Sequence, residues 1–216
     1  MAHVRYPEDL FKVQRQLLGR YHVDDPETFF SGSKQWRVPN DPTGESSTAN
    51  VFQPPYYLTL QMPEQESASF SLTSTYVPAQ GNAGQRNNLT AFLAVDADAG
   101  TESGTRREGY GTLRLLELPD ATNVSGPPQV QNAFKADPEI GEQLNPLKVG
   151  GSTIQYGNLL TLPMAGGLLY VQPVYIRSKG ETTYPVLRRV LVGYGECGID
   201  SQFAFYDVDP VAISSP

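Results

Sequence analysis

The chain has few of the residues from which catalytic and metal sites are usually built. Its 216 residues include one cysteine, Cys197, and two histidines, His3 and His22. A single cysteine excludes an intrachain disulfide framework, and so small a set of cysteine and histidine argues against a structural zinc site. No G-x-S-x-G nucleophile elbow and no Walker phosphate loop is present. The sequence therefore offers no catalytic residue to name.

Positive charge is also scarce. The chain carries 16 lysines and arginines against 23 acidic residues, which gives a net charge of -7. A nucleic-acid-binding protein usually presents a basic face. The densest basic pairs here are only Arg106-Arg107 and Arg188-Arg189. We therefore expect no nucleic-acid partner, and an anionic membrane surface is disfavoured for the same reason.

The chain lacks a continuous apolar run long enough for a membrane-spanning helix, which needs about 20 residues. Residues 149–176 contain no charge, but Pro163 and Gly166 divide the segment into short apolar pieces rich in β-branched and aromatic residues. Such pieces predict a buried β-hairpin with residues 164–167 as its loop, each strand covered on both faces. Pro173 cannot donate a hydrogen bond to a sheet and should mark an edge strand or a bulge.

Helical signals are concentrated at the start of the chain. Pro7 and the acidic pair that follows it suit the first turn of a helix, and Pro26 marks a second helix start. These signals predict a helical segment over residues 7–31. One apolar stripe recurs at helical spacing in it, formed by Leu10, Leu17, Leu18 and Tyr21.

Strand signals dominate the rest of the chain. Alternation of apolar and polar residues predicts sheet over residues 54–118 and 152–195. Between these regions, two proline-containing start signals predict a short helical insertion over residues 127–149. The fold predicted is α+β, mainly antiparallel sheet with an N-terminal helical segment and a short helical insertion. We expect residues 1–216 to form a single soluble domain.

One loop carries a candidate metal site. Asp96, Asp98 and Glu102 place three carboxylates in a glycine-bearing loop directly after a predicted strand. Calcium binds six to eight oxygens, often from alternate residues of a loop, although the glycine here arrives one place too early for an EF-hand. The alternative is a solvated loop between two strands. Apart from this calcium hypothesis, no cofactor is predicted.

Four tyrosines form a candidate ligand-binding set because they flank proline-containing strand pieces: Tyr56, Tyr57, Tyr170 and Tyr175. Tyrosine rings favour interfaces at which one end is apolar and the other is wet. The four rings could line a groove for a peptide, a glycan or a partner subunit. The alternative is that they are ordinary core residues of the sheet, since strands favour aromatic residues.

Six long blocks of sequence, in the same order, resemble a family of large, uncharacterised bacterial membrane proteins found mainly in actinobacteria and cyanobacteria. The blocks are RYPEDLFKVQRQLLGRYHVDDPETFFSG, QPPYYLTLQMP, FSLTSTYVP, NLTAFLAVDAD, VQNAFKADPEI and YGNLLTLPMAGGLLYVQPVYI. The resemblance runs from about Val4 to about Tyr194, and the stretch containing Cys197 departs from it. It implies that this chain is the extracytoplasmic, soluble part of a longer parent with several transmembrane helices.

The resemblance brings no assigned activity and no catalytic residue. The leading hypothesis is therefore a non-catalytic interaction or assembly domain, held at the cell membrane by its parent and located outside the cytoplasm. Its expected partners are the membrane-embedded part of the parent chain and a protein or other component of the cell envelope. Two alternatives are a cell-envelope hydrolase that uses carboxylates, with or without calcium, and a ligand-binding module with a tyrosine-lined groove.

Overall fold

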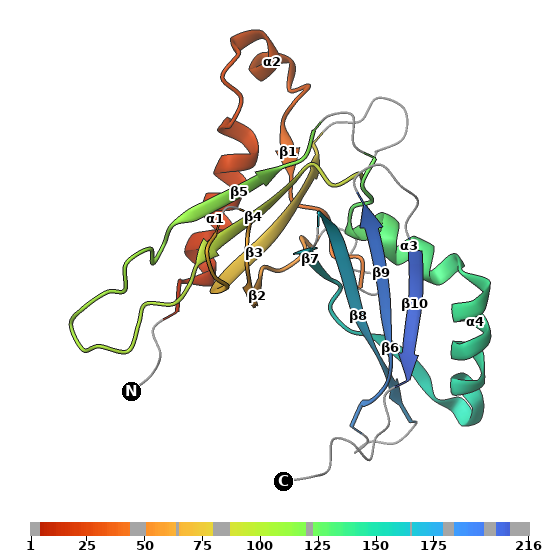
Figure 1. The fold of residues 1–216 in the computed structure, drawn as a ribbon. Coiled ribbons are helices and arrows are strands. Elements are labelled where there is room, and N and C mark those ends of the chain that lie inside the picture. The colour runs from red at the N-terminus through yellow and green to blue at the C-terminus, as the bar shows by residue number, and fades with distance from the viewer. Residues whose placement is uncertain are drawn as a thin grey trace. The chain divides into compact units, whose positions relative to one another are not determined.

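The computed structural model describes residues 5–43, 51–63, 65–79, 87–119, 123–164, 166–178, 184–196 and 202–207. Helices and two antiparallel sheets confirm the predicted α+β class (Figure 1). The chain divides into two compact units: Met1–Asp41 with Thr48–Gly126, and Pro42–Ser47 with Pro127–Pro216. The single-domain organisation stays a prediction, and each unit is described by itself.

In the part of unit 1 that the structure describes, two helices accompany a five-stranded antiparallel sheet. Its elements are α1 (Glu8–Tyr21), α2 (Pro26–Ser31), β1 (Trp36–Arg37), β2 (Tyr56–Leu60), β3 (Ser69–Pro78), β4 (Ala91–Asp96) and β5 (Leu113–Glu117). The strand order is β1-β3-β4-β5, and β2 pairs with β3 beyond the stretch that pairs with β1. The long strand β3 therefore holds the sheet together.

The predicted N-terminal helical segment is confirmed as two helices with ordinary end signals. Pro7 is the residue that precedes the first turn of α1, which contains Glu8 and Asp9. The carboxylate of Asp25 caps α2 by accepting a hydrogen bond from the backbone N–H of Thr28 at 2.7 Å. Gly32 ends α2 with a φ of 69°, a conformation that glycine adopts without strain.

The predicted apolar stripe of α1 lies largely on the outer side of the helix. Leu10, Leu17 and Tyr21 are 47%, 53% and 59% exposed, and of the four predicted residues only Leu18 packs against the core. The buried side consists of Phe11, Arg15 and Gly19. These three residues follow one another at spacings of four, so they form a true helical face. A pattern of apolar residues does not reveal this face, because two of its three residues are an arginine and a glycine.

The inner side of α1 is fitted closely to the sheet of unit 1. Phe11 is fully buried among core residues that include Trp36, Leu72 and Tyr76. At Gly19, a Cβ atom would lie 2.9 Å from the backbone oxygen of Trp36, so the helix approaches β1 as closely as a glycine allows. This position therefore needs glycine for packing, although glycine weakens a helix.

Unit 2 contains helices followed by a second five-stranded antiparallel sheet. Its elements are α3 (Pro127–Ala136), α4 (Pro138–Leu144), the 3-10 helix η2 (Asn145–Gly151), β6 (Thr153–Tyr156), β7 (Leu160–Met164), β8 (Gly167–Arg177), β9 (Val186–Glu196) and β10 (Gln202–Asp207). The strand order is β10-β9-β8-β6, and β7 also pairs with β8. Helix α3 is tied to β8 by a buried hydrogen bond from the amide of Gln172 to that of Gln131.

The hairpin predicted in the charge-free segment is confirmed as β7 and β8, which pair from Met164 opposite Gly167. Its details differ in one respect. One side of β8 is buried and the other is half-buried, so the strand is not covered equally on both faces. Of the two alternatives predicted for Pro173, the edge strand is wrong, because β8 is interior; a register shift of the kind a bulge produces lies one residue beyond it, between Val174 and Tyr175. Within the described ranges, none of the helices has the length and hydropathy needed to cross a membrane.

Two helical glycines give a matched test of the close packing of α1. We expect Gly19→Ala to destabilise unit 1 by about 1–3 kcal/mol, because the added methyl group meets backbone that cannot move cheaply. Gly141→Ala in α4 meets nothing within 4 Å and should stabilise its helix by about 0.5–1 kcal/mol. Urea unfolding followed by Trp36 fluorescence and by circular dichroism measures both effects. Equal stabilisation by the two substitutions would show that α1 is not seated as described.

Candidate functional site

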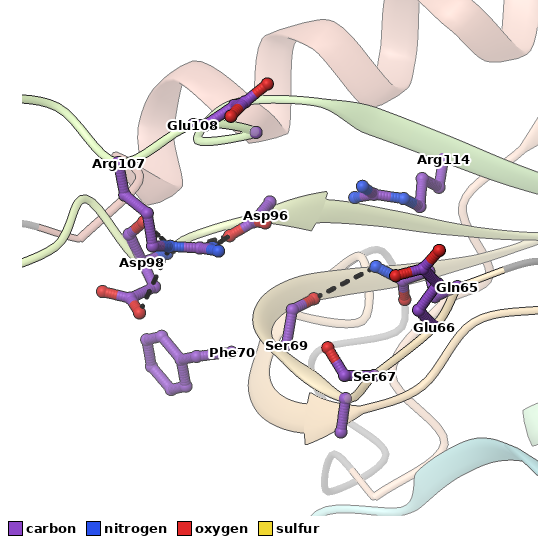
Figure 2. Close-up of a pocket in the computed structure, with 12 residues that line it drawn as sticks. Gln65, Glu66, Ser67, Ser69, Phe70, Asp96, Asp98, Arg107, Glu108 and Arg114 are labelled. Carbon is purple, nitrogen blue, oxygen red and sulfur yellow. Dashed lines mark hydrogen bonds and ion pairs between the residues drawn. The ribbon is translucent and has the colours of Figure 1, made fainter.

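Unit 1 contains a pocket of about 420 Å³, within the range of roughly 300–1,000 Å³ usual for small-molecule sites. It lies where the segment between β2 and β3 meets the end of β4 and the β4–β5 connection (Figure 2). Among the described residues that line it, six are charged: Glu66, Asp96, Asp98, Arg107, Glu108 and Arg114. The pocket is therefore polar, and Phe70 is the one aromatic residue in this set.

The inner part of this pocket is an ion pair in which the carboxylate is buried and the guanidinium group is partly exposed. Asp96 is the last residue of β4, and its side chain is only 4% exposed. Arg107 donates from Nη2 to Oδ1 of Asp96 and from Nε to the backbone oxygen of Asp98 at 3.0 Å. Its Nε also lies 3.4 Å from Oδ2 of Asp98. An isolated carboxylate at this depth would be costly, so Arg107 is the group that permits it.

The backbone of the β4–β5 connection brings Arg107 back over the end of β4. The N–H of Arg107 donates to the backbone oxygen of Ala99 at 2.9 Å. Farther along, the N–H of Gly111 donates to the backbone oxygen of Asp96 at 2.8 Å. These two hydrogen bonds fold the connection back toward the end of β4. They place the guanidinium group of Arg107 beside the carboxylate of Asp96, which lies 11 residues earlier in the chain.

The three residues of the predicted calcium site are not equivalent in the structure. Asp96 and Asp98 lie together against Arg107, whereas Glu102 is an exposed residue of the connecting loop. Within the described ranges, no group of three or more His, Cys, Asp or Glu residues could hold a metal ion. A cation at Asp96 would lie beside the guanidinium group of Arg107, which would repel it. The calcium site stays a prediction.

The four tyrosines of the predicted ligand set divide between the units. Tyr56 and Tyr57 lie in β2 of unit 1, whereas Tyr170 and Tyr175 lie in β8 of unit 2. Tyr170 is 1% exposed and belongs to the core, while the other three are half-buried. The Tyr57 hydroxyl donates to the backbone oxygen of Tyr6 at 2.6 Å. Burial raises the pKa of Tyr56 and of Tyr57. A ligand-binding role for the set stays a prediction.

A surface that the sequence did not predict as a site lies on α1 and α2. We call it the outer helical surface; its exposed apolar residues are Leu10, Val13, Leu17, Tyr21 and Phe30. Each is at least 47% exposed, and Phe30 reaches 86%. The Tyr21 ring stacks on that of Phe29 at 5.7 Å, and Phe29 meets Phe30 edge-on at 5.8 Å. The apolar surface is therefore continuous from one helix to the next.

A family model described as the uncharacterised protein family UPF0182 matches residues 1–147. The chain belongs to the UPF0182 family. This confirms the resemblance to an uncharacterised bacterial family that the six sequence blocks predict.

UPF0182 relatives are much longer than this chain. The UPF0182 protein of Paenarthrobacter aurescens is 58% identical over 196 residues, which cover 91% of this chain and 19% of the relative. A UPF0182 protein of Leifsonia xyli subsp. xyli is 51% identical over 215 residues, covering 100% of this chain and 21% of the relative. The chain thus spans about one fifth of the length of the curated relatives it matches. No solved structure matches the chain.

The ion pair of Asp96 and Arg107 can be tested with two neighbouring aspartates. Asp96→Asn should destabilise unit 1 by about 1–3 kcal/mol. This cost is lower than that of breaking a fully buried ion pair, because Arg107 is 39% exposed and solvent screens its charge. Asp98→Asn, at a carboxylate that is 50% exposed, should cost less than about 0.5 kcal/mol. Urea unfolding followed by Trp36 fluorescence distinguishes the two, and equal costs would contradict this description of the pocket.

Proposed function

We propose that this chain is a non-catalytic interaction and assembly domain of a larger UPF0182 protein. The domain docks onto the rest of the same polypeptide through the outer helical surface. The observation that supports the proposal is the continuous run of exposed apolar side chains on α1 and α2. Single exposed apolar residues are common on soluble proteins, but contiguous ones mark interaction surfaces.

The greater length of the relatives favours an intramolecular partner. About four fifths of each curated relative lies outside the region that this chain matches. A partner on the same polypeptide is present at a high effective concentration, so a surface of moderate size is sufficient for docking. The proposal places the domain outside the cytoplasm, attached to the membrane-embedded part of the parent, as the family resemblance implies.

Thiol labelling tests the proposed docking. In a Cys197→Ser background, Leu17→Cys should react rapidly with a maleimide in the 216-residue chain, because Leu17 is 53% exposed. In a full-length UPF0182 protein carrying this sequence, we expect Leu17→Cys to be labelled about tenfold more slowly, or slower still. A tenfold ratio corresponds to a docked state that is more stable than the undocked state by ~1.4 kcal/mol. Thr101→Cys, in the exposed β4–β5 connection, is the matched control and should react equally in both proteins.

Three results would contradict parts of this proposal. Equal labelling of Leu17→Cys in both proteins would remove the outer helical surface as a docking site. Labelling of the isolated chain that slows as its concentration rises would identify a second copy as the partner instead. If a membrane-impermeant maleimide reaches Thr101→Cys only after cells are lysed, the domain does not lie outside the cytoplasm.

A further inference from the structure

The pocket of unit 1 has a charge pattern that the docking proposal does not explain. The described residues that line it carry four carboxylates and two guanidinium groups, a net charge of -2. A negatively charged ligand would be repelled by this balance. A cationic ligand would meet two guanidinium groups. The charges therefore favour a neutral ligand whose polar groups can pair with acceptors and donors alike.

Hydrogen-bond donors and acceptors alternate across the pocket. Figure 2 shows the guanidinium groups of Arg107 and Arg114 pointing toward each other from opposite sides, with the carboxylate of Asp96 between them. Arg107 uses its Nη2 and Nε atoms on Asp96 and Asp98, which fixes the guanidinium group in place. Among the described residues, Arg114 makes no hydrogen bond or ion pair. Its donors are therefore available to a ligand.

The opposite wall adds groups that both donate and accept. The amide of Gln65 donates to the hydroxyl of Ser69 at 3.4 Å, and that hydroxyl lies 3.1 Å from the hydroxyl of Ser71. Phe70 lies between these two serines in β3, but its ring stacks on Tyr57, with 5.5 Å between centroids and planes 8° apart, and packs against the core of unit 1. The groups available to a ligand on this wall are therefore the polar ones.

We propose that this pocket binds a neutral polyhydroxylated ligand of about the size of a monosaccharide. A hydroxyl group both donates and accepts hydrogen bonds, so neighbouring hydroxyls can donate to Asp96 while accepting from Arg114. The cavity of about 420 Å³ accommodates one sugar ring. This binding site is separate from the outer helical surface, and the proposal of the site does not depend on the docking function.

The expected affinity is low and sets the choice of method. A ligand with about a dozen non-hydrogen atoms, at ordinary ligand efficiency, gives a Kd of about 1–10 mM. Nuclear magnetic resonance detects binding of this strength. The probes are N-acetylglucosamine, galactose and myo-inositol, each added to the ¹⁵N-labelled 216-residue chain up to about 50 mM.

We expect at least one of these probes to cause saturable shifts confined to residues 65–70, 96–98 and 107–114. Arg114→Met should weaken that binding at least about fivefold, because the ligand loses a charged donor. Arg188→Met in β9 of unit 2 is the matched control and should leave the Kd unchanged.

Several outcomes would overturn the assignment. Absence of saturable shifts with all three probes removes the polyol site. Equal binding by the chain and by Arg114→Met shows that the pocket is not the place of binding. Saturable shifts at the same residues with sodium sulfate or calcium chloride, at lower concentrations than with any polyol, identify an anion or a metal site instead. None of these outcomes affects the labelling test of the outer helical surface.

Discussion

The hydrogen bonds of Arg15 determine which side of α1 faces the sheet. Its Nη1 donates to the backbone oxygen of Gln53 at 2.9 Å and to the hydroxyl of Ser74 at 3.0 Å, while the Tyr76 hydroxyl donates to the backbone oxygen of Arg15 at 2.6 Å. Burial lowers the pKa of Arg15 and raises that of Tyr76. A buried cation stripped of such bonds would cost several kcal/mol, so the helix cannot rotate about its axis. Leu17 and its apolar neighbours are therefore held at the outer surface.

This constraint connects the packing of unit 1 with its proposed role. If the apolar side of α1 could turn inward, its exposure would be a defect of folding and not a surface for binding. The close approach at Gly19 and the burial of Phe11 leave no room for that exchange. The outer helical surface is thus a fixed feature of unit 1. A fixed surface binds with a smaller loss of conformational entropy than a mobile one, which favours its use in assembly.

Local signals in the sequence were sufficient to predict most elements, but not their orientation. Capping by Asp25 and the β7–β8 hairpin turn depend on residues adjacent in the chain. The side of α1 that is buried depends instead on Gln53 and Ser74, which no helical pattern contains. The pocket shows the same limit. Asp96 and Asp98 are close in sequence, whereas Arg114 reaches them only through the register of β4 and β5, in which Ala94 lies opposite Arg114. An aspartate loop alone does not distinguish a metal site from an ion pair with a distant arginine.

Hydrogen exchange of the 216-residue chain tests the central claim most directly. If Arg15 and Gly19 fix α1 to the sheet, the amides in the middle of α1 should exchange as slowly as those of β3 and β4, because all three open only when unit 1 unfolds. The same protection is expected even though the outer helical surface is unoccupied in this chain. Rapid exchange in α1 beside slow exchange in β3 and β4 would contradict the claim, since the helix would then open without the sheet.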